Sequence, residues 1–386
     1  MNKDYLLFHR PFISDEEINE MVDTLRSGWL SMGPKTLKFE QEFNSYIGSK
    51  KSIAVNSWTA AGHLTLEAFG VKAGDEVIVP TMTFPATAEI VCYFGAKPVI
   101  VDVDQDTLNI SLEAIEKAIT PRTKAIIPVH YGGQPCDMDE ILDLAKKYNL
   151  RVMEDAAHSL PATYKGKKVG TISEVTCFSF YATKTLSTGE GGMICSNNEE
   201  LSERCAIMRL HGINRDAWKR YTESGSWYYE VVAPGYKYNF TDLQASLGLP
   251  QLKKVDAMWE WRKNIAKKYT EDLKDNDMLT LHTIKPDRES SWHLYPVRLN
   301  LEMLSITRSE FIEEMKKRNI GVGVHFMPVH QHLFYNKTFN LDDKDYPIAS
   351  AAFPRLMSLP IYPGMTDEQV HKVIDVLLDL LKKFRR

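Results

Sequence analysis

From residue 52 to residue 154 the chain alternates short apolar segments with predicted helices, and this alternation limits the fold more than any other feature. Strands are predicted at 52–55, 76–79, 98–102, 124–130 and 151–154, and a helix is predicted after each of the first four. Apolar strands alternating with helices form a mostly parallel sheet that helices cover on both faces. Ligands bind such α/β sheets at the carboxyl ends of the strands. We therefore expect the functional residues to follow the strands directly.

The chain is long enough for two domains. Of its 386 residues, we assign 1–249 to the large, mostly parallel-sheet α/β/α domain and 250–386 to a smaller C-terminal α+β domain. The boundary is placed at Pro250, which is expected to kink a long helical stretch. The small domain is predicted to contain a strand at 292–299, a helix at 308–318, a strand at 322–326 and a terminal helix at 366–384.

Charge and composition exclude several classes of function. The net charge is −4 without long runs of one sign, so no nucleic-acid partner is expected. The first ten residues lack an apolar core and no apolar run is long enough to span a bilayer, so we expect neither a signal peptide nor a membrane contact. The five cysteines form no C-x-x-C pair, which indicates reduced thiols in a cytoplasmic protein. The histidines lack the spacing of metal ligands, and no G-x-G-x-x-G follows the first strand, so neither a metal site nor a dinucleotide site is expected.

Lys184 lies between two predicted buried strands, at 175–181 and 192–196. A lysine at a strand exit among apolar neighbours loses part of its hydration, which lowers its pKa and provides a neutral amine for Schiff-base chemistry. The alternative is a solvated loop lysine, which is the usual environment of this residue.

Two further segments suggest a ligand. Asp155 ends the strand at 151–154, where a poorly solvated carboxylate needs a cationic or donor partner, although it would also serve as a helix cap. The turn 56–61 opens a helix whose free N–H groups suit a phosphate, although an ordinary N-cap has the same residues.

Together these features describe one cofactor. Pyridoxal phosphate requires a lysine, an acidic group at the pyridine nitrogen, a phosphate site and a flat group against the ring. Lys184, Asp155, the helix start from Ser57 to Ala60 and Phe84 supply these four parts.

At this point the chain resembles the DegT/DnrJ/EryC1/StrS family of sugar aminotransferases, which are fold-type-I pyridoxal phosphate enzymes. The resemblance runs over nearly the full length, and it implies the two-domain α/β architecture described above. It is carried in order by SGWLSMGP (27–34), VNSWTAA (55–61), GDEVIVPTMTFPAT (74–87), TKAIIPVHYGG (123–133), EDAAHS (154–159), SFYATKTLSTGEGGM (179–193), PGYKYNFTDLQAS (234–246) and GVGVHF (321–326).

The resemblance also implies roles for individual residues. Lys184 would hold the cofactor as a Schiff base and shuttle protons, and Asp155 would pair with the ring nitrogen. His158 would lie near the ring oxygen and Phe84 would stack on the ring. The phosphate would be held by Thr59, Ala60 and Ser179, with Asn239 reaching in from the second subunit of a homodimer that shares its active sites. Trp29, His325 and His330 are expected to contact the sugar nucleotide.

One position departs from the family. Residue 58 is Trp, where relatives usually carry a small residue beside the phosphate helix. The indole would either crowd the phosphate site or extend the wall that faces the sugar nucleotide.

The implied reaction is a ping-pong transamination, in which L-glutamate donates its amine and a nucleotide-linked keto sugar accepts it. TGEGG at 188–192 resembles members that aminate C4 of UDP-linked 4-keto sugars, such as a 4-keto-6-deoxy-N-acetylhexosamine, for surface polysaccharides or glycans. Members that act at C3 of dTDP sugars more often carry GDGG or GDAG there.

Other functions remain open. They are C4 amination of a UDP-4-keto pentose in lipid A (lipopolysaccharide) modification, C3 amination of a dTDP-3-keto sugar, and a regulator that binds cofactor or sugar nucleotide without turnover. Sugar dehydratases of this fold replace the lysine by histidine, so Lys184 argues against that activity.

Overall fold

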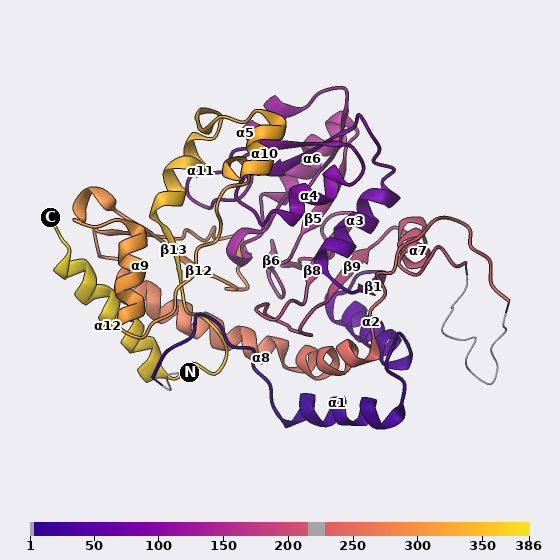
Figure 1. Cartoon of the computed structure of the whole chain (residues 1–386), viewed down its shortest axis with the longest axis horizontal. Helices are drawn as coiled ribbons and strands as arrows, with labels where there is room; N and C mark the ends of the chain where they lie inside the picture. The colour runs from indigo at the N-terminus through magenta and orange to yellow at the C-terminus, as the bar shows by residue number, and fades with distance from the viewer. Residues whose placement is uncertain (1–3, 215–227) are drawn as a thin grey trace.

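The computed structural model describes residues 4–214 and 228–386 (Figure 1). The stretch from Trp218 to Tyr229, which the sequence predicts to be a loop rich in aromatic and charged residues, lies outside the described residues except for Tyr228 and Tyr229.

Two helices with sequence-encoded ends precede the first strand. Helix α1 (Asp15–Ser27) begins with a capping box between Ser14 and Glu17 and ends at Gly28, whose φ of 74° is left-handed. Helix α2 (Pro34–Ile47) begins with a proline in its first turn. The Asp242 carboxylate caps α2, because it accepts hydrogen bonds from the backbone N–H groups of Gly33, Lys35 and Thr36 at 2.9–3.0 Å.

The large unit is built on a seven-stranded sheet of order β1-β9-β8-β5-β4-β2-β3. Strand β9 pairs antiparallel with β1 and β8, and the remaining pairs are parallel. The predicted mostly parallel sheet is therefore confirmed. The strands are β1 (Lys51–Val55), β2 (Glu76–Pro80), β3 (Lys97–Val101), β4 (Thr123–Ile126), β5 (Arg151–Asp155), β8 (Val175–Ser179) and β9 (Gly192–Ser196).

Helices cover both faces of this sheet because its strands are apolar on both sides. Val77 and Val79 of β2 pack with helices α3, α4 and α7, whereas Ile78 between them packs with α5 and α6 on the opposite face. These helices are α3 (Trp58–Ala68), α4 (Ala86–Cys92), α5 (Leu112–Ala118), α6 (Met138–Tyr148) and α7 (Glu199–Met208).

Helix α8 (Asp242–Leu273) runs from the large unit to the small one (Figure 1). Its first residue caps α2, and Lys268 near its other end forms an ion pair with Asp367 of the terminal helix α12 (Asp367–Lys383). Pro250 lies inside this continuous helix. The domain division at residues 249 and 250 stays a prediction, and it falls within α8.

The small unit packs a three-stranded antiparallel sheet against helices. The sheet has the order β10-β12-β13, and Leu299, Phe311, Met357 and Leu377 are among the residues of its core. The predicted strand at 322–326 is wrong, because that segment makes one bridge, between Gly323 and Ser358. The elements are β10 (Leu279–Leu281), β12 (Tyr295–Leu299), α9 (Arg308–Lys317), α10 (Leu333–Phe339), α11 (Pro347–Ala352) and β13 (Leu356–Leu359).

A small sheet of β6 (Thr163–Tyr164), β7 (Lys167–Lys168) and β11 (Arg288–Glu289) joins the two units, since β11 pairs with β6. Across the described part of the chain, no helix combines the length and apolar character needed to cross a membrane.

A buried polar network fixes the end of β5. Glu154 is fully buried and accepts hydrogen bonds from the Ser173 hydroxyl at 2.6 Å and the Thr176 hydroxyl at 2.9 Å. Its second oxygen lies 2.9 Å from Nε2 of the buried His130. Despite burial, these partners lower the pKa of Glu154, so the carboxylate is ionised and ties β5 to the loops beside it.

Replacing Glu154 by Ala leaves His130 and the two hydroxyl donors without their acceptor. We expect the free energy of unfolding to fall by about 3–5 kcal/mol, as when one partner of a buried pair is removed. Urea denaturation followed by circular dichroism measures this loss. Glu113→Ala removes an exposed i,i+4 ion pair and serves as the control, with an expected change below about 0.5 kcal/mol. Equal stability of the two variants would contradict the assigned network.

Candidate active site

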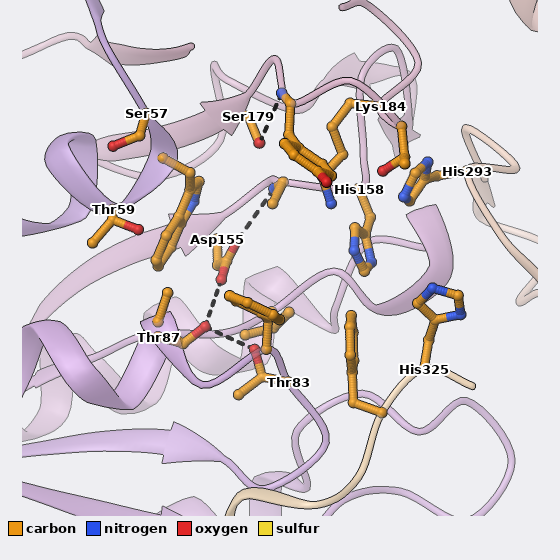
Figure 2. Close-up of a pocket in the computed structure, with 18 of the residues that line it drawn as sticks. Ser57, Thr59, Thr83, Thr87, Asp155, His158, Ser179, Lys184, His293 and His325 are labelled. Atoms are coloured by element: carbon orange, nitrogen blue, oxygen red, sulfur yellow. Dashed lines mark hydrogen bonds between the residues drawn. The ribbon is translucent and has the colours of Figure 1, made fainter. Parts of the chain in front are cut away.

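A cavity of about 570 Å³ lies where the strands of the large sheet end, and both units contribute to its wall (Figure 2). This volume is within the range of small-molecule sites. Its lining includes Phe8, His9, Ser57, Trp58, Thr59, Thr83, Phe84, Thr87, Asp155, His158, Ser179, Tyr181, Lys184, Glu190, His293, His325, Phe326 and Ile361.

Lys184 reaches this cavity from the loop between β8 and β9. Its backbone N–H donates to the carbonyl of Tyr181 at 2.9 Å, which fixes the turn that carries it. Burial lowers the pKa of the Lys184 amine to about 8, although the nearby Asp155 carboxylate acts in the opposite direction. The loss of hydration expected from the sequence is therefore present, and a substantial fraction of the amine is neutral near physiological pH.

Asp155 ends β5 and faces the same cavity. Its carboxylate accepts hydrogen bonds from the Thr87 hydroxyl at 2.9 Å and the Ala157 backbone N–H at 3.1 Å. Thr87 in turn lies 2.7 Å from the Thr83 hydroxyl (Figure 2). Burial raises the pKa of Asp155 to about 6, and the hydrogen bonds and Lys184 oppose that rise. The side chain is therefore mostly ionised at neutral pH and held in one orientation.

The opposite end of the cavity offers a site for an anion. Ser57 caps α3, and its hydroxyl accepts the Ala60 N–H at 3.0 Å. The earlier N–H groups of α3 have no acceptor within the helix, and Thr59 and Ser179 line the cavity beside them (Figure 2). Of the predicted phosphate residues, Thr59 and Ser179 face the cavity, whereas the Ala60 amide is already bonded to Ser57.

Gly192 allows strand β9 to lie close to the start of α3. A Cβ on Gly192 would lie 2.5 Å from the Ser57 carbonyl oxygen and 2.9 Å from the Trp58 nitrogen. Strand β9 can therefore approach the start of α3 because residue 192 has no side chain.

Aromatic and imidazole rings form the remaining wall. Phe84 is 61% exposed at the cavity, with its ring centroid 6.2 Å from that of Phe326. His158 is buried and stacks on Phe326 at 5.6 Å. His325 lines the same wall, and its Nδ1 lies 3.0 Å from the Ser358 hydroxyl. The structure therefore brings Phe84, His158 and His325 together in one cavity wall.

Trp58 belongs to the wall of the cavity. Its indole N–H donates to the Cys177 carbonyl at 3.1 Å, and Cys177 pairs with Asp155 between β8 and β5. The indole is thereby anchored to the strand beside Asp155.

Four predicted site residues lie outside this lining: Ala60, Trp29, Asn239 and His330. His330 is fully buried, with Nδ1 2.6 Å from the Thr81 hydroxyl and Nε2 3.0 Å from Asp343, and its expected contact with the sugar nucleotide stays a prediction. Both ring nitrogens therefore have protein partners. The Trp29 indole donates to the Met32 carbonyl at 3.2 Å, and the Asn239 amide donates to the Phe240 carbonyl at 3.1 Å.

The structure adds residues that sequence reasoning missed. Thr83 and Thr87 orient Asp155. The run of hydroxyl residues that follows β2 is the sequence feature that could have indicated them. Phe8, His9 and His293 also line the cavity, but they come from segments without a recognisable pattern.

Comparison with known proteins agrees with this geometry. Residues 11–378 match the model of the DegT/DnrJ/EryC1/StrS aminotransferase family. The chain belongs to this family. It is therefore a pyridoxal-phosphate-dependent aminotransferase, which rules out the alternative of a regulator without turnover.

Individual relatives cover nearly the whole chain. The spore coat polysaccharide biosynthesis protein SpsC of Bacillus subtilis is 48% identical over 98% of this chain and 97% of its own. A putative sugar aminotransferase from Streptococcus pneumoniae, solved in its PMP form, has a TM-score of 0.92 and 36% identity, with coverage of 98% and 99% of the two chains. Helicobacter pylori PseC, an aminotransferase of pseudoaminic acid biosynthesis, has a TM-score of 0.91 and 30% identity, with coverage of 98% and 100%.

The residues of the aminotransferase cavity fit pyridoxal phosphate. Lys184 would supply the amine that holds the aldehyde, Asp155 would be the acidic partner of the pyridine nitrogen, and the start of α3 with Ser179 would hold the phosphate. When bound, the cofactor acts as an electron sink for the carbon that loses a proton.

The lowered pKa of Lys184 predicts how the cofactor attaches. We expect the rate of attachment to the apoprotein to rise with pH and to level off above about pH 8, because the neutral amine is the nucleophile. Mixing apoprotein with pyridoxal phosphate between about pH 6 and pH 10 and following the visible absorbance measures this profile. Lys184→Ala is expected to give no such band. A midpoint near the ordinary lysine value of about 10.4 would contradict the assignment.

Proposed function

We propose that this aminotransferase transfers the amino group of L-glutamate to C4 of a nucleotide-linked 4-keto sugar. The preferred acceptor is a UDP-linked 4-keto-6-deoxy-N-acetylhexosamine, and the product is used in cell-surface polysaccharide or glycan biosynthesis.

One observation carries the proposal. Lys184, Asp155 and the start of α3 share one cavity in a chain that resembles SpsC and PseC over nearly its full length. The names of both relatives connect them with amino sugars or polysaccharides. The TGEGG segment at 188–192 favours C4 over C3, and its Glu190 lines the cavity.

Lys184 moves the proton in this proposal. An amine with a pKa of about 8 can take a proton from one carbon and return it to another at neutral pH, since both of its forms are populated. Asp155, held by Thr87 and the Ala157 N–H, would supply the negative charge that keeps the pyridine nitrogen protonated.

We also propose that the enzyme works as a homodimer with shared active sites. Phe84 and Tyr181 line the cavity and remain 61% and 46% exposed in one chain, which is consistent with a cavity that a second subunit completes. Asn239 would then contribute its amide to the cofactor phosphate of the partner. His325 is the proposed sugar-nucleotide contact that lines this chain's own cavity.

A two-stage assay tests the proposed reaction. We expect L-glutamate to bleach the visible band of the holoenzyme, and we expect a UDP-4-keto-6-deoxy-N-acetylhexosamine to restore it. A UDP-4-keto pentose and a dTDP-3-keto sugar serve as the matched alternatives, and Lys184→Ala is the inactive control. Restoration by the dTDP-3-keto sugar but not by either UDP sugar would overturn the C4 assignment.

A further inference from the structure

Histidines crowd one side of the cavity, across from the start of α3 (Figure 2). The ring centroids of His158 and His293 are 4.6 Å apart, and both residues are 5% exposed. His325 and His9 line the cavity with them, the latter from the N-terminal segment. We call these four residues the histidine wall.

Three nitrogen atoms of the histidine wall are buried without a hydrogen-bond partner in the described part of the chain. They are Nδ1 of His158, Nδ1 of His293 and Nε2 of His9. Buried polar atoms in native proteins normally have a partner. Several such atoms at one cavity wall therefore indicate a polar group that the protein itself does not supply.

The electrostatic surroundings of the wall favour a negatively charged group. Burial lowers the pKa of His158 and His293 well below the ordinary value, and the nearby Lys184 contributes in the same direction. The charged or titratable groups that face His293 are Lys184, His158, Arg262 and His9, while His158 faces Lys184 and His325. Neutral imidazoles in this setting each retain one N–H that can donate.

Arg262 of α8 adds positive charge behind the wall. It is 1% exposed, and its guanidinium donates to the backbone carbonyls of Ile361 at 2.7 Å and Trp292 at 3.3 Å. Among the described residues no carboxylate forms an ion pair with it. Arg262 is not part of the cavity lining, so its charge acts on the wall from behind and favours an anion there.

We propose that the histidine wall binds a carboxylate group of the amino donor. The inference rests on the proposed function, which makes L-glutamate that donor. Unpartnered imidazole nitrogens match a carboxylate, which accepts several hydrogen bonds, and the positive charge of Arg262 behind the wall favours an anion.

Two other ligands suit the wall less well. Among the described residues no group of three His, Cys, Asp or Glu side chains is arranged to hold a metal ion. A phosphate already has its site at the start of α3, where free N–H groups and the helix dipole favour it. The histidine wall and the start of α3 lie on opposite sides of the cavity, with Lys184 and Asp155 between them (Figure 2). The donor's carboxylate and the cofactor's phosphate would therefore have separate sites.

Titration calorimetry of the holoenzyme with glutarate, a dicarboxylate that has no amine to transfer, tests the site directly. His293→Phe removes the N–H donor with a ring of similar shape, and we expect it to weaken glutarate binding by about 10- to 100-fold, the loss of a hydrogen bond to a charged group. His293→Gln keeps a donor and is expected to lose less. His282→Gln changes a histidine outside the cavity lining and is the matched control, with unchanged binding expected.

Each outcome decides between alternatives. Unchanged glutarate affinity in His293→Phe overturns the proposal. If the same variant binds UDP more weakly, the wall is assigned to the nucleotide diphosphate instead. If His293→Phe does not retain the cofactor band, His9→Leu provides the same test from the other side of the wall. A wild-type holoenzyme that binds glutarate but whose band no amino acid bleaches would contradict the proposed reaction while leaving the carboxylate site intact.

Discussion

The site depends on the burial of two opposite charges at the carboxyl ends of neighbouring strands. Asp155 ends β5 and Lys184 follows β8, and the parallel pairing of these strands brings both side chains into one cavity. Burial moves the two pKa values toward each other, to about 6 for Asp155 and about 8 for Lys184. A carboxylate and an amine poised in this way suit a cofactor that needs one group charged and the other able to exchange a proton.

The rest of the molecule fixes the positions of Asp155 and Lys184 and completes the wall of the cavity. Glu154, the neighbour of Asp155, binds His130, Ser173 and Thr176 and so anchors the strand from the opposite side. Helix α8 starts by capping α2 through Asp242 and ends against α12, so one element joins the sheet to the small unit. The small unit contributes His293, His325 and Phe326 to the cavity, and the two units are therefore both parts of the site.

Much of the fold and part of the candidate site were predictable because they depend on local sequence. The alternation of strands and helices determined the sheet, and Lys184 and Asp155 stood at strand ends where their chemistry could be inferred. The prediction of a strand at 322–326 was wrong because this segment contacts the small sheet through a single bridge, although its apolar residues alternate as in a strand. His330 lies outside the cavity lining, where Thr81 and Asp343, both far away in sequence, are the partners of its ring nitrogens. His9 and His293 join the site through tertiary packing, which no local pattern encodes.

We propose that Lys184 is the residue that holds the cofactor in this cavity. Borohydride reduction of the holoenzyme, followed by digestion and mass spectrometry, identifies the lysine to which the cofactor is attached. We predict a single phosphopyridoxyl group on the peptide that contains Lys184. Attachment to a different lysine, or no attachment in protein that carries the visible band, would contradict the account.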